Sequence, residues 1–204
     1  NKGMEGGIPD HNFSPKAGDV KYRDLNGDYK IDDKDVAAIG YPKYPLLTGN
    51  MSLGFSWNGL DFSMVWSGAF KTSRLVSSFY RVPFDTTNNR ALLSYMIKDA
   101  WTPEKGNSST APAISFGASK ANNYKDSDLW LRDASYVRLK NIELGYSFPK
   151  QIVKKMHLGT LRLSVSGYNL LTFDDMGFCD PESNPDGQAY PLIKVVNFGL
   201  KVGF

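Results

Sequence analysis

The sequence predicts an all-β protein whose framework is about five long antiparallel strands. Apolar and polar residues alternate without interruption over the last eleven residues, 194–204. The pair Asn58-Gly59 separates two other alternating stretches, and the connections between stretches are short and long in turn. A strand with one apolar and one polar face suits either a soluble sheet with one wet side or a barrel wall between lipid and a polar lumen.

The first two strands are predicted to form a hairpin. Large apolar residues recur at every second position over residues 51–57 and again over 60–66. Only Asn58-Gly59 lies between them, and this pair readily adopts the positive φ angles of a two-residue type I′ turn. In such a hairpin Trp57 and Leu60 pair and point the same way, so the turn and the pattern agree on the register.

Three further strands are predicted over residues 136–148, from Leu161 onward, and over 194–204. In the first of these the alternation slips at Lys140-Asn141, and a one-residue bulge there would keep the whole apolar set on one face. The strands run about nine to thirteen residues, the length that a tilted strand needs to cross a bilayer. Strands of soluble domains cluster nearer five or six residues.

The predicted connections alternate in length. Residues 71–133 and 173–191 are long loops, the first with one short helix near 89–100, whereas Asn58-Gly59 and residues 149–159 are short. Outer-membrane barrels have this arrangement, with short periplasmic turns and long extracellular loops. If the short Asn58-Gly59 turn is periplasmic, the predicted domains are residues 1–48, an extracellular loop, and residues 49–204, the strands with these two long loops.

If the Asn58-Gly59 turn is periplasmic, three of the predicted strands run toward the periplasm, and an aromatic girdle is predicted where they end. The residues that end these strands are Trp57, Phe148 and Phe204. Girdles of aromatic residues mark the membrane interfaces of such barrels. Five strands cannot close a spanning barrel, and open sheet edges are not stable in lipid, so the membrane interpretation requires further strands. A soluble antiparallel sheet packed on a core is the alternative.

The composition excludes several classes of function. The 24 basic and 21 acidic residues are scattered, so no nucleic-acid partner is expected. Cys179 is the single cysteine, which excludes an intramolecular disulfide, and we expect an inert loop thiol. Neither a nucleophile elbow nor a readable triad is present, so no enzyme and no catalytic or cofactor-binding residue is predicted. Because the chain starts at Asn1 without a leader, we expect a piece of a longer protein.

An acidic segment has the spacing of a calcium-binding loop, with oxygen-bearing groups at positions 1, 3, 5, 7, 9 and 12. The residues are Asp24, Asn26, Asp28, Lys30 through its carbonyl, Asp32 and Asp35. Two positions depart from the pattern: Tyr29 replaces the usual glycine, and Asp35 replaces the longer glutamate. Calcium is the one cofactor predicted, with a solvated acidic turn as the alternative. His11 and His157 have no ligand-spaced neighbours and are expected at the surface.

Several motifs together resemble one protein family. They are GDVKYRDLNGDYKIDDKDVAAIGYPKYP at residues 18–45, DASYVRLKNIELGYSFPK at 133–150, LRLSVSGYNLLTF at 161–173, the DPE of Asp180 to Glu182, the pair Tyr190-Pro191, and VNFGLKVGF at 196–204. In this order they resemble the C-terminal portion of the SusC/RagA family of TonB-dependent outer-membrane transporters.

The resemblance implies the last five or so strands of a 22-stranded transmembrane β-barrel in the outer membrane. It implies as partners the remaining barrel and plug, a SusD-like surface lipoprotein, the TonB complex through the N-terminal part, membrane lipid, and an oligosaccharide or peptide substrate. The implied function is nutrient import. The alternative function is a secreted or surface all-β glycan-binding module stabilised by calcium.

Overall fold

The computed structural model describes residues 7–85, 91–177, 179–183, 190 and 192–204. The chain divides into two compact units. The loop unit comprises Asn1–Gly40 and Leu75–Leu131, and the sheet unit comprises Tyr41–Arg74 and Arg132–Phe204. The domain boundaries expected from the sequence follow the strands and loops instead, and they stay a prediction.

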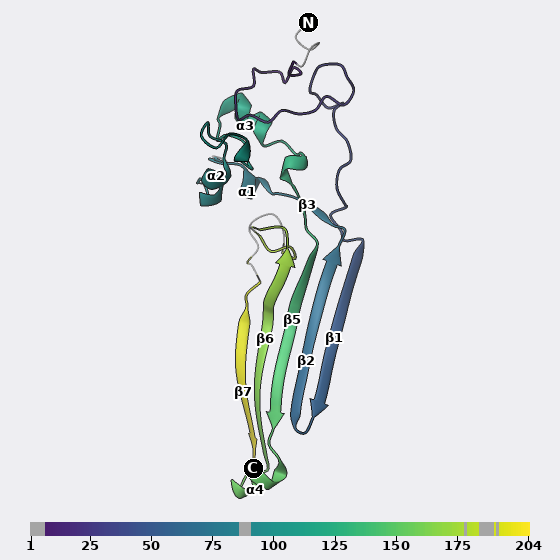
Figure 1. The fold of residues 1–204 in the computed structure, drawn as a ribbon, viewed down its shortest axis with the longest axis vertical. Coiled ribbons are helices and arrows are strands. Elements are labelled where there is room, and N and C mark those ends of the chain that lie inside the picture. Colours follow the sequence, from purple (N-terminus) through teal and green to yellow (C-terminus); the bar gives the residue numbers. More distant parts are fainter. Residues whose placement is uncertain (1–6, 86–90, 178, 184–189, 191) are drawn as a thin grey trace. The chain divides into compact units, whose positions relative to one another are not determined.

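The sheet unit is built on a five-stranded antiparallel sheet, so the predicted framework is confirmed. Its strands are β1 (Leu47–Trp57), β2 (Leu60–Phe70), β5 (Tyr136–Ser147), β6 (Thr160–Asp174) and β7 (Val195–Gly203). They lie side by side in the order β1-β2-β5-β6-β7 (Figure 1). The strands have 9 to 15 residues, which spans the length expected for crossing a bilayer.

The β1–β2 hairpin has the predicted turn and register. Asn58 and Gly59 have φ angles of 50° and 89°, and Trp57 lies opposite Leu60. Gly59 is needed for a second reason, since a Cβ there would lie 2.5 Å from the carbonyl oxygen of Ser147. The Gly59 carbonyl accepts the Ser147 N–H at 2.7 Å, which fixes the turn against the end of β5.

The predicted bulge in β5 is confirmed, and β6 contains another. Val65 lies opposite Asn141 while Trp66 lies opposite Leu139, so Lys140 is an extra residue. On the other side, two residues of β6 at Asn169 stand opposite this one extra residue, and Asn169 has a φ of 52°. The sequence does not predict this β6 bulge, because Asn169 interrupts a stretch of mixed polarity rather than a clean alternation.

Short elements complete the chain. A two-stranded sheet pairs β3 (Ser73–Leu75) with β4 (Leu131–Asp133). The helices are α1 (Ser78–Arg81), α2 (Ser94–Asp99), α3 (Gly117–Asn123), α4 (Lys150–Lys155) and the 3-10 turns η2 (Gly106–Ser108) and η3 (Asp128–Trp130). None of the described helices is long and apolar enough to cross a membrane.

The prediction of one short helix near residues 89–100 was too simple. The helix α2 is shorter than expected, and residues 89 and 90 lie outside the described residues. The other described helices have three to seven residues, at most two turns. Elements this short leave no 3.6-residue periodicity in the sequence, so pattern analysis misses them.

The loop unit is held together by a buried amide. The Asn123 side chain is fully buried, and its Oδ1 accepts the Val20 N–H at 2.8 Å. Its Nδ2 donates to Asp19 at 2.9 Å, and its own carbonyl accepts from Trp130 Nε1 at 2.9 Å. These bonds join the segment before β1 to the long excursion between β3 and β4, so two predicted loops fold together.

The expected surface position of His11 was wrong. His11 is buried in the loop unit, and its two ring nitrogens contact the Pro9 carbonyl at 2.6 Å and the Tyr22 N–H at 3.1 Å. Because Nε2 accepts the Tyr22 N–H, Nδ1 carries the proton and the ring is neutral. His157 is exposed, as expected, in the link after α4.

Candidate functional site

One face of the sheet is apolar across all five strands. The strand register places large apolar side chains opposite one another in rows that run from β1 to β7. Two such rows are Phe55, Phe62, Leu144, Val165, Phe198 and Trp57, Leu60, Tyr146, Leu163, Leu200. The β5 bulge returns the alternation to register, so the apolar set stays on this face along the whole of β5.

These apolar side chains are exposed or half-buried rather than packed in a core. Phe198 and Leu200 on β7 are 86% and 66% exposed, and Leu144 on the central strand β5 is 43% exposed. The described strands contact mainly their neighbours within the sheet, with α4 also touching β6. A contiguous apolar face of this extent indicates a surface that is covered by something other than water. Among the described residues, no second sheet packs on this apolar face as it would in a sandwich.

The predicted girdle residues are offset along the strands in equal steps. Trp57 lies in the row that contains Tyr146 and Leu200. Phe148 is two residues beyond Tyr146 and two strands from β1, and Phe204 is four residues beyond Leu200 and four strands from β1. The aromatic positions thus shift by one residue along the strand for each strand crossed. At a rise of about 3.3 Å per residue and a spacing of about 4.8 Å between strands, the line through them slopes by about 35° relative to the direction across the sheet. Strands in barrels tilt by this amount, which would bring all three aromatic residues to one height.

The opposite face of the sheet is lined by small and polar side chains, with an ion-pair cluster across three strands. Arg162 of β6 donates through both Nη atoms to the carboxylate of Asp61 on β2, with Nη2–Oδ2 at 2.7 Å. Nη2 also donates to Glu143 of β5 at 3.0 Å. A Cβ on Gly145 would lie 2.6 Å from Arg162 Cζ, so the missing side chain lets Arg162 reach across β5.

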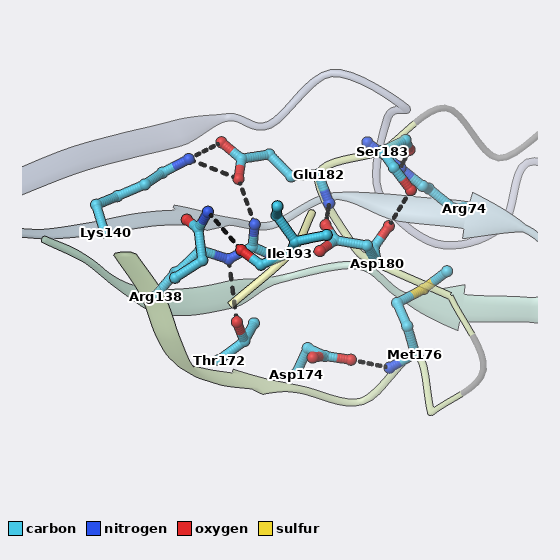
Figure 2. A network of polar contacts seen from close by, with 11 residues as sticks. Arg74, Arg138, Lys140, Thr172, Asp174, Met176, Asp180, Glu182, Ser183 and Ile193 are labelled. Carbon is cyan, nitrogen blue, oxygen red and sulfur yellow. Dashed lines mark hydrogen bonds and ion pairs between the residues drawn. The ribbon is translucent and has the colours of Figure 1, made fainter. Parts of the chain in front are cut away.

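A second charged cluster lies on the same face at the other end of the strands, around Arg138. Its Nη2 donates to Asp180 at 2.6 Å and its Nη1 to Glu182 at 2.9 Å, as Figure 2 shows. Its Nε donates to Thr172 Oγ1 at 3.0 Å. Lys140 Nζ contacts both carboxylate oxygens of Glu182 at 2.7 Å. These bonds hold Asp180 and Glu182, in the segment after β6, against the polar face of the sheet.

Pattern analysis missed the Arg138 cluster as a site. Two of the motifs that carry the family resemblance contain its members, Arg138 and Lys140 in one and Asp180 and Glu182 in the other. An arginine at a polar-face position of a strand, combined with a distant pair of acids, was the available signal. The sequence alone gives no reason to pair them, because Arg138 and the two acids are more than forty residues apart in the sequence.

The predicted calcium residues lie in one turn of the loop unit. The Asp24 carboxylate accepts the N–H groups of Gly27 and Tyr29, both at 2.7 Å. Asp35 closes the turn by accepting the Asp32 N–H at 2.9 Å and the Leu25 N–H at 2.8 Å, and these two bonds hold the pKa of Asp35 below its usual range. Asn26 and Asp28 bond backbone N–H groups within the same turn.

Two observations bear on whether this turn fits a metal. Tyr29 has a φ of 61°, the left-handed conformation that glycine supplies in a calcium loop, so its departure from the sequence pattern does not change the backbone. Within the described part of the chain, no group of three or more His, Cys, Asp or Glu side chains is placed as a metal-ligand set. The calcium site stays a prediction.

The two faces of the sheet define the class of fold: a stretch of antiparallel barrel wall, open at β1 and β7 among the described residues. The solved structure of the RagAB peptide importer in its open-open state has this fold, with a TM-score of 0.67, 22% identity and coverage of 93% of this chain and 21% of that chain. Its closed-closed state matches with a TM-score of 0.63. The predicted fold class is therefore confirmed.

Curated relatives carry the comparison from fold to family. The chain is 28% identical over 202 residues to the TonB-dependent receptor P3 of Formosa agariphila, covering 90% of this chain and 19% of that protein. It is 26% identical over 184 residues to the TonB-dependent receptor SusC of Bacteroides thetaiotaomicron, covering 89% and 17%. No family model matches. The predicted resemblance to the SusC/RagA transporters is confirmed, and the chain spans about a fifth of the relatives' length.

Proposed function

We propose that this chain is the C-terminal part of the barrel wall of a TonB-dependent outer-membrane importer of nutrients. The observation that carries the proposal is the pair of opposite faces. Exposed apolar rows cross all five strands on one face, and glycine, serine, asparagine and paired charges occupy the other. Lipid contacts suit the first face and a polar lumen suits the second.

The cargo of this importer is an oligosaccharide or a peptide, and its partners are the rest of the barrel and plug, a SusD-like surface lipoprotein and the TonB complex. The similarity to proteins named SusC and RagAB supports this proposal, the latter being called a peptide importer. The test is uptake in cells that carry the complete gene. Deleting either the SusD-like gene or the TonB gene should abolish uptake of the cargo, and undiminished uptake in both deletions would contradict the proposal.

The rival is a secreted or surface glycan-binding module, and solubility separates the two. An isolated chain whose apolar rows face lipid should aggregate without detergent and fold only with detergent or with the remaining strands, because open sheet edges and apolar rows are then unprotected. Sedimentation in buffer without detergent makes the measurement. A stable soluble monomer would favour the glycan-binding module.

The acidic turn of the loop unit supports a second proposal, that calcium binds there and stiffens it. The side chains of Asp24, Asn26, Asp28, Asp32 and Asp35 would supply oxygens and Lys30 its carbonyl, which is the hard oxygen set that Ca²⁺ prefers. Bound calcium would neutralise the mutual repulsion of the acids. We expect calcium to raise the melting temperature of the complete protein, and the double variant Asp24→Ala and Asp28→Ala to lose the effect. Equal melting with calcium and with chelator in the unsubstituted protein would refute this site.

A further inference from the structure

Arg138 is buried in a way that its neighbours on the polar face are not. Its side chain is 1% exposed, whereas Arg162 on the same face is 30% exposed. A buried guanidinium needs partners for its donors, and Arg138 has them in Asp180, Glu182 and Thr172. The ring of Tyr136 lies 5.5 Å from its Cζ and covers it further. The burial comes from the segment after β6, which supplies both acids.

That segment, residues 179–183, is folded into a tight turn whose two acidic side chains point toward Arg138. Asp180 Oδ1 accepts the Glu182 N–H at 2.8 Å, and its carbonyl accepts both the N–H and the hydroxyl of Ser183. Arg74 Nη1 donates to the Ser183 carbonyl at 2.5 Å. Figure 2 shows the turn held between Arg74 on one side and Arg138 with Lys140 on the other. Three cations thus hold a five-residue segment.

We propose that Arg138 is a positioning residue that keeps residues 179–183 folded over the polar face, so that this segment forms a fixed part of the passage wall and limits which cargo passes. The inference rests on the proposed function, because the polar face becomes a passage wall only in a complete barrel. Folding an extracellular connection inward narrows a barrel at that level, as a plugged or constricted lumen requires.

The exposed edge of the cluster is the part that cargo would meet. Lys140 and Glu182 have side chains about one third exposed, 31% and 30%, while Arg138 and Asp180 lie beneath them. The bulge in β5 contributes directly, since Lys140 is the extra residue and its Nζ reaches Glu182. The buried pair Arg138 and Asp180 therefore fixes the position of the segment, and the exposed pair Lys140 and Glu182 supplies polar contacts to cargo. Removing the buried pair should free the segment and disrupt the exposed pair.

The contacts of Arg138 with Asp180 and Glu182 form a clasp on residues 179–183, and Cys179 reports on this clasp without any added probe residue. It is half-buried next to Asp180, and burial raises the pKa of its thiol, so it should react slowly with an alkylating agent while the clasp is closed. The experiment measures the alkylation rate of the Cys179 peptide by mass spectrometry, in the complete protein within outer-membrane vesicles. Breaking a buried ion pair by removing one partner is strongly destabilising, so Arg138→Gln should raise the rate at least about tenfold.

A loop-side variant and a matched control keep the test decisive. Asp180→Asn changes no strand residue, so the barrel has no reason to misfold, and it should raise the rate in the same direction as Arg138→Gln. Arg162→Gln removes an equal charge from the same face outside the cluster and should leave the rate unchanged. Unchanged alkylation in Asp180→Asn, or equal acceleration in Arg162→Gln, would overturn the clasp.

Uptake gives the second readout and separates this inference from the proposed function. Compared with cells that carry the unsubstituted importer, cells that carry the Asp180→Asn variant should take up more long cargo relative to short cargo. An unchanged ratio would overturn the role of residues 179–183 in limiting cargo. If the unsubstituted protein supports no uptake at all, the proposed function fails, and the alkylation rates alone then decide whether Arg138 holds the segment.

Discussion

The sheet unit and the loop unit differ in which side chains they bury and which they expose. In the sheet unit large apolar residues such as Phe198 and Leu200 are exposed, and the most deeply buried large side chain is the charged Arg138. In the loop unit Trp130 and Met96 are buried, and so are the polar residues Asn122 and Asn123. The loop unit follows the rule of a water-soluble protein, with a small apolar core and satisfied buried amides.

The two units thus have the side-chain distributions expected for two different solvents. An antiparallel sheet satisfies its own backbone groups except at its edges, so its apolar face is free to meet lipid. The loop unit has little regular structure, and the buried side-chain amide of Asn123 accepts the backbone N–H of Val20 from a distant segment. Adding a charge should therefore be most costly on the apolar face of the sheet unit, and removing a buried polar group should be costly in the loop unit.

The largest effect is expected for a charge on the apolar face. Leu200→Lys should destabilise the complete barrel by about 2 to 4 kcal/mol if the site faces the middle of the bilayer. The free energy of unfolding in lipid vesicles, from urea titration, measures this. Asn197→Lys on the polar face of the same strand is the control and should change the stability little. Equal tolerance of lysine at both positions would remove the lipid-facing assignment.

A smaller loss is expected from removing the buried amide of the loop unit. Asn123→Ala leaves the Val20 N–H without its acceptor and breaks the bond to Asp19, for a cost of about 2 kcal/mol. Hydrogen exchange of the Val20 amide measures the local loss, and protection in β5 should be unaffected. The exposed Asn107→Ala serves as the matched control. Loss of protection in both units together would show that they do not behave independently.

An added methyl at Gly145 tests the reach of Arg162 across β5. Gly145→Ala places a Cβ against the guanidinium and 2.8 Å from Asp61 Oδ2, which should cost about 1 kcal/mol or slightly more through overpacking. Gly49→Ala on β1, where a Cβ has no atom within 4 Å, is the control. Denaturant unfolding of both variants gives the comparison, and equal stability would contradict the crossing geometry.

The smallest effect is expected from acid in the loop unit. Because the N–H groups of Asp32 and Leu25 hold the pKa of Asp35 below its ordinary value of 3.8, the turn gains stability that is fully present above pH 3.8. That contribution is lost as the pH falls through the lower folded-state pKa. Asp35→Asn should remove this pH dependence. Amide exchange at Leu25 between pH 5 and pH 2.5 measures it, and identical profiles for both proteins would refute it.

Strand positions could be predicted from the sequence because the sheet obeys local rules. The Asn58-Gly59 turn and the alternation in β7 each specify their geometry within a few residues, and the β5 bulge follows from a slip in the same pattern. The pattern left a soluble sheet and a barrel wall as alternatives, and the family resemblance favoured the barrel wall.

The rest depends on contacts between distant segments. The union of residues before β1 with the excursion around α3 rests on Asn123, whose partners are about one hundred residues away in the sequence. The Arg138 cluster likewise joins β5 to a connection beyond β6. Single side chains make these contacts, and they leave no periodic pattern in the sequence from which they could be predicted. The predicted calcium residues do lie in one turn, because a twelve-residue loop is itself a local rule.

The central claim, that the apolar rows meet lipid and the other face lines a polar lumen, is tested most directly by spin labels on two faces of β7. A nitroxide is attached at Leu200→Cys or at Asn197→Cys in the complete protein, in a Cys179→Ser background and in lipid bilayers. Collisions with oxygen should dominate at position 200, and collisions with a water-soluble nickel complex should dominate at position 197. Greater access of the nickel complex at position 200 would contradict the account.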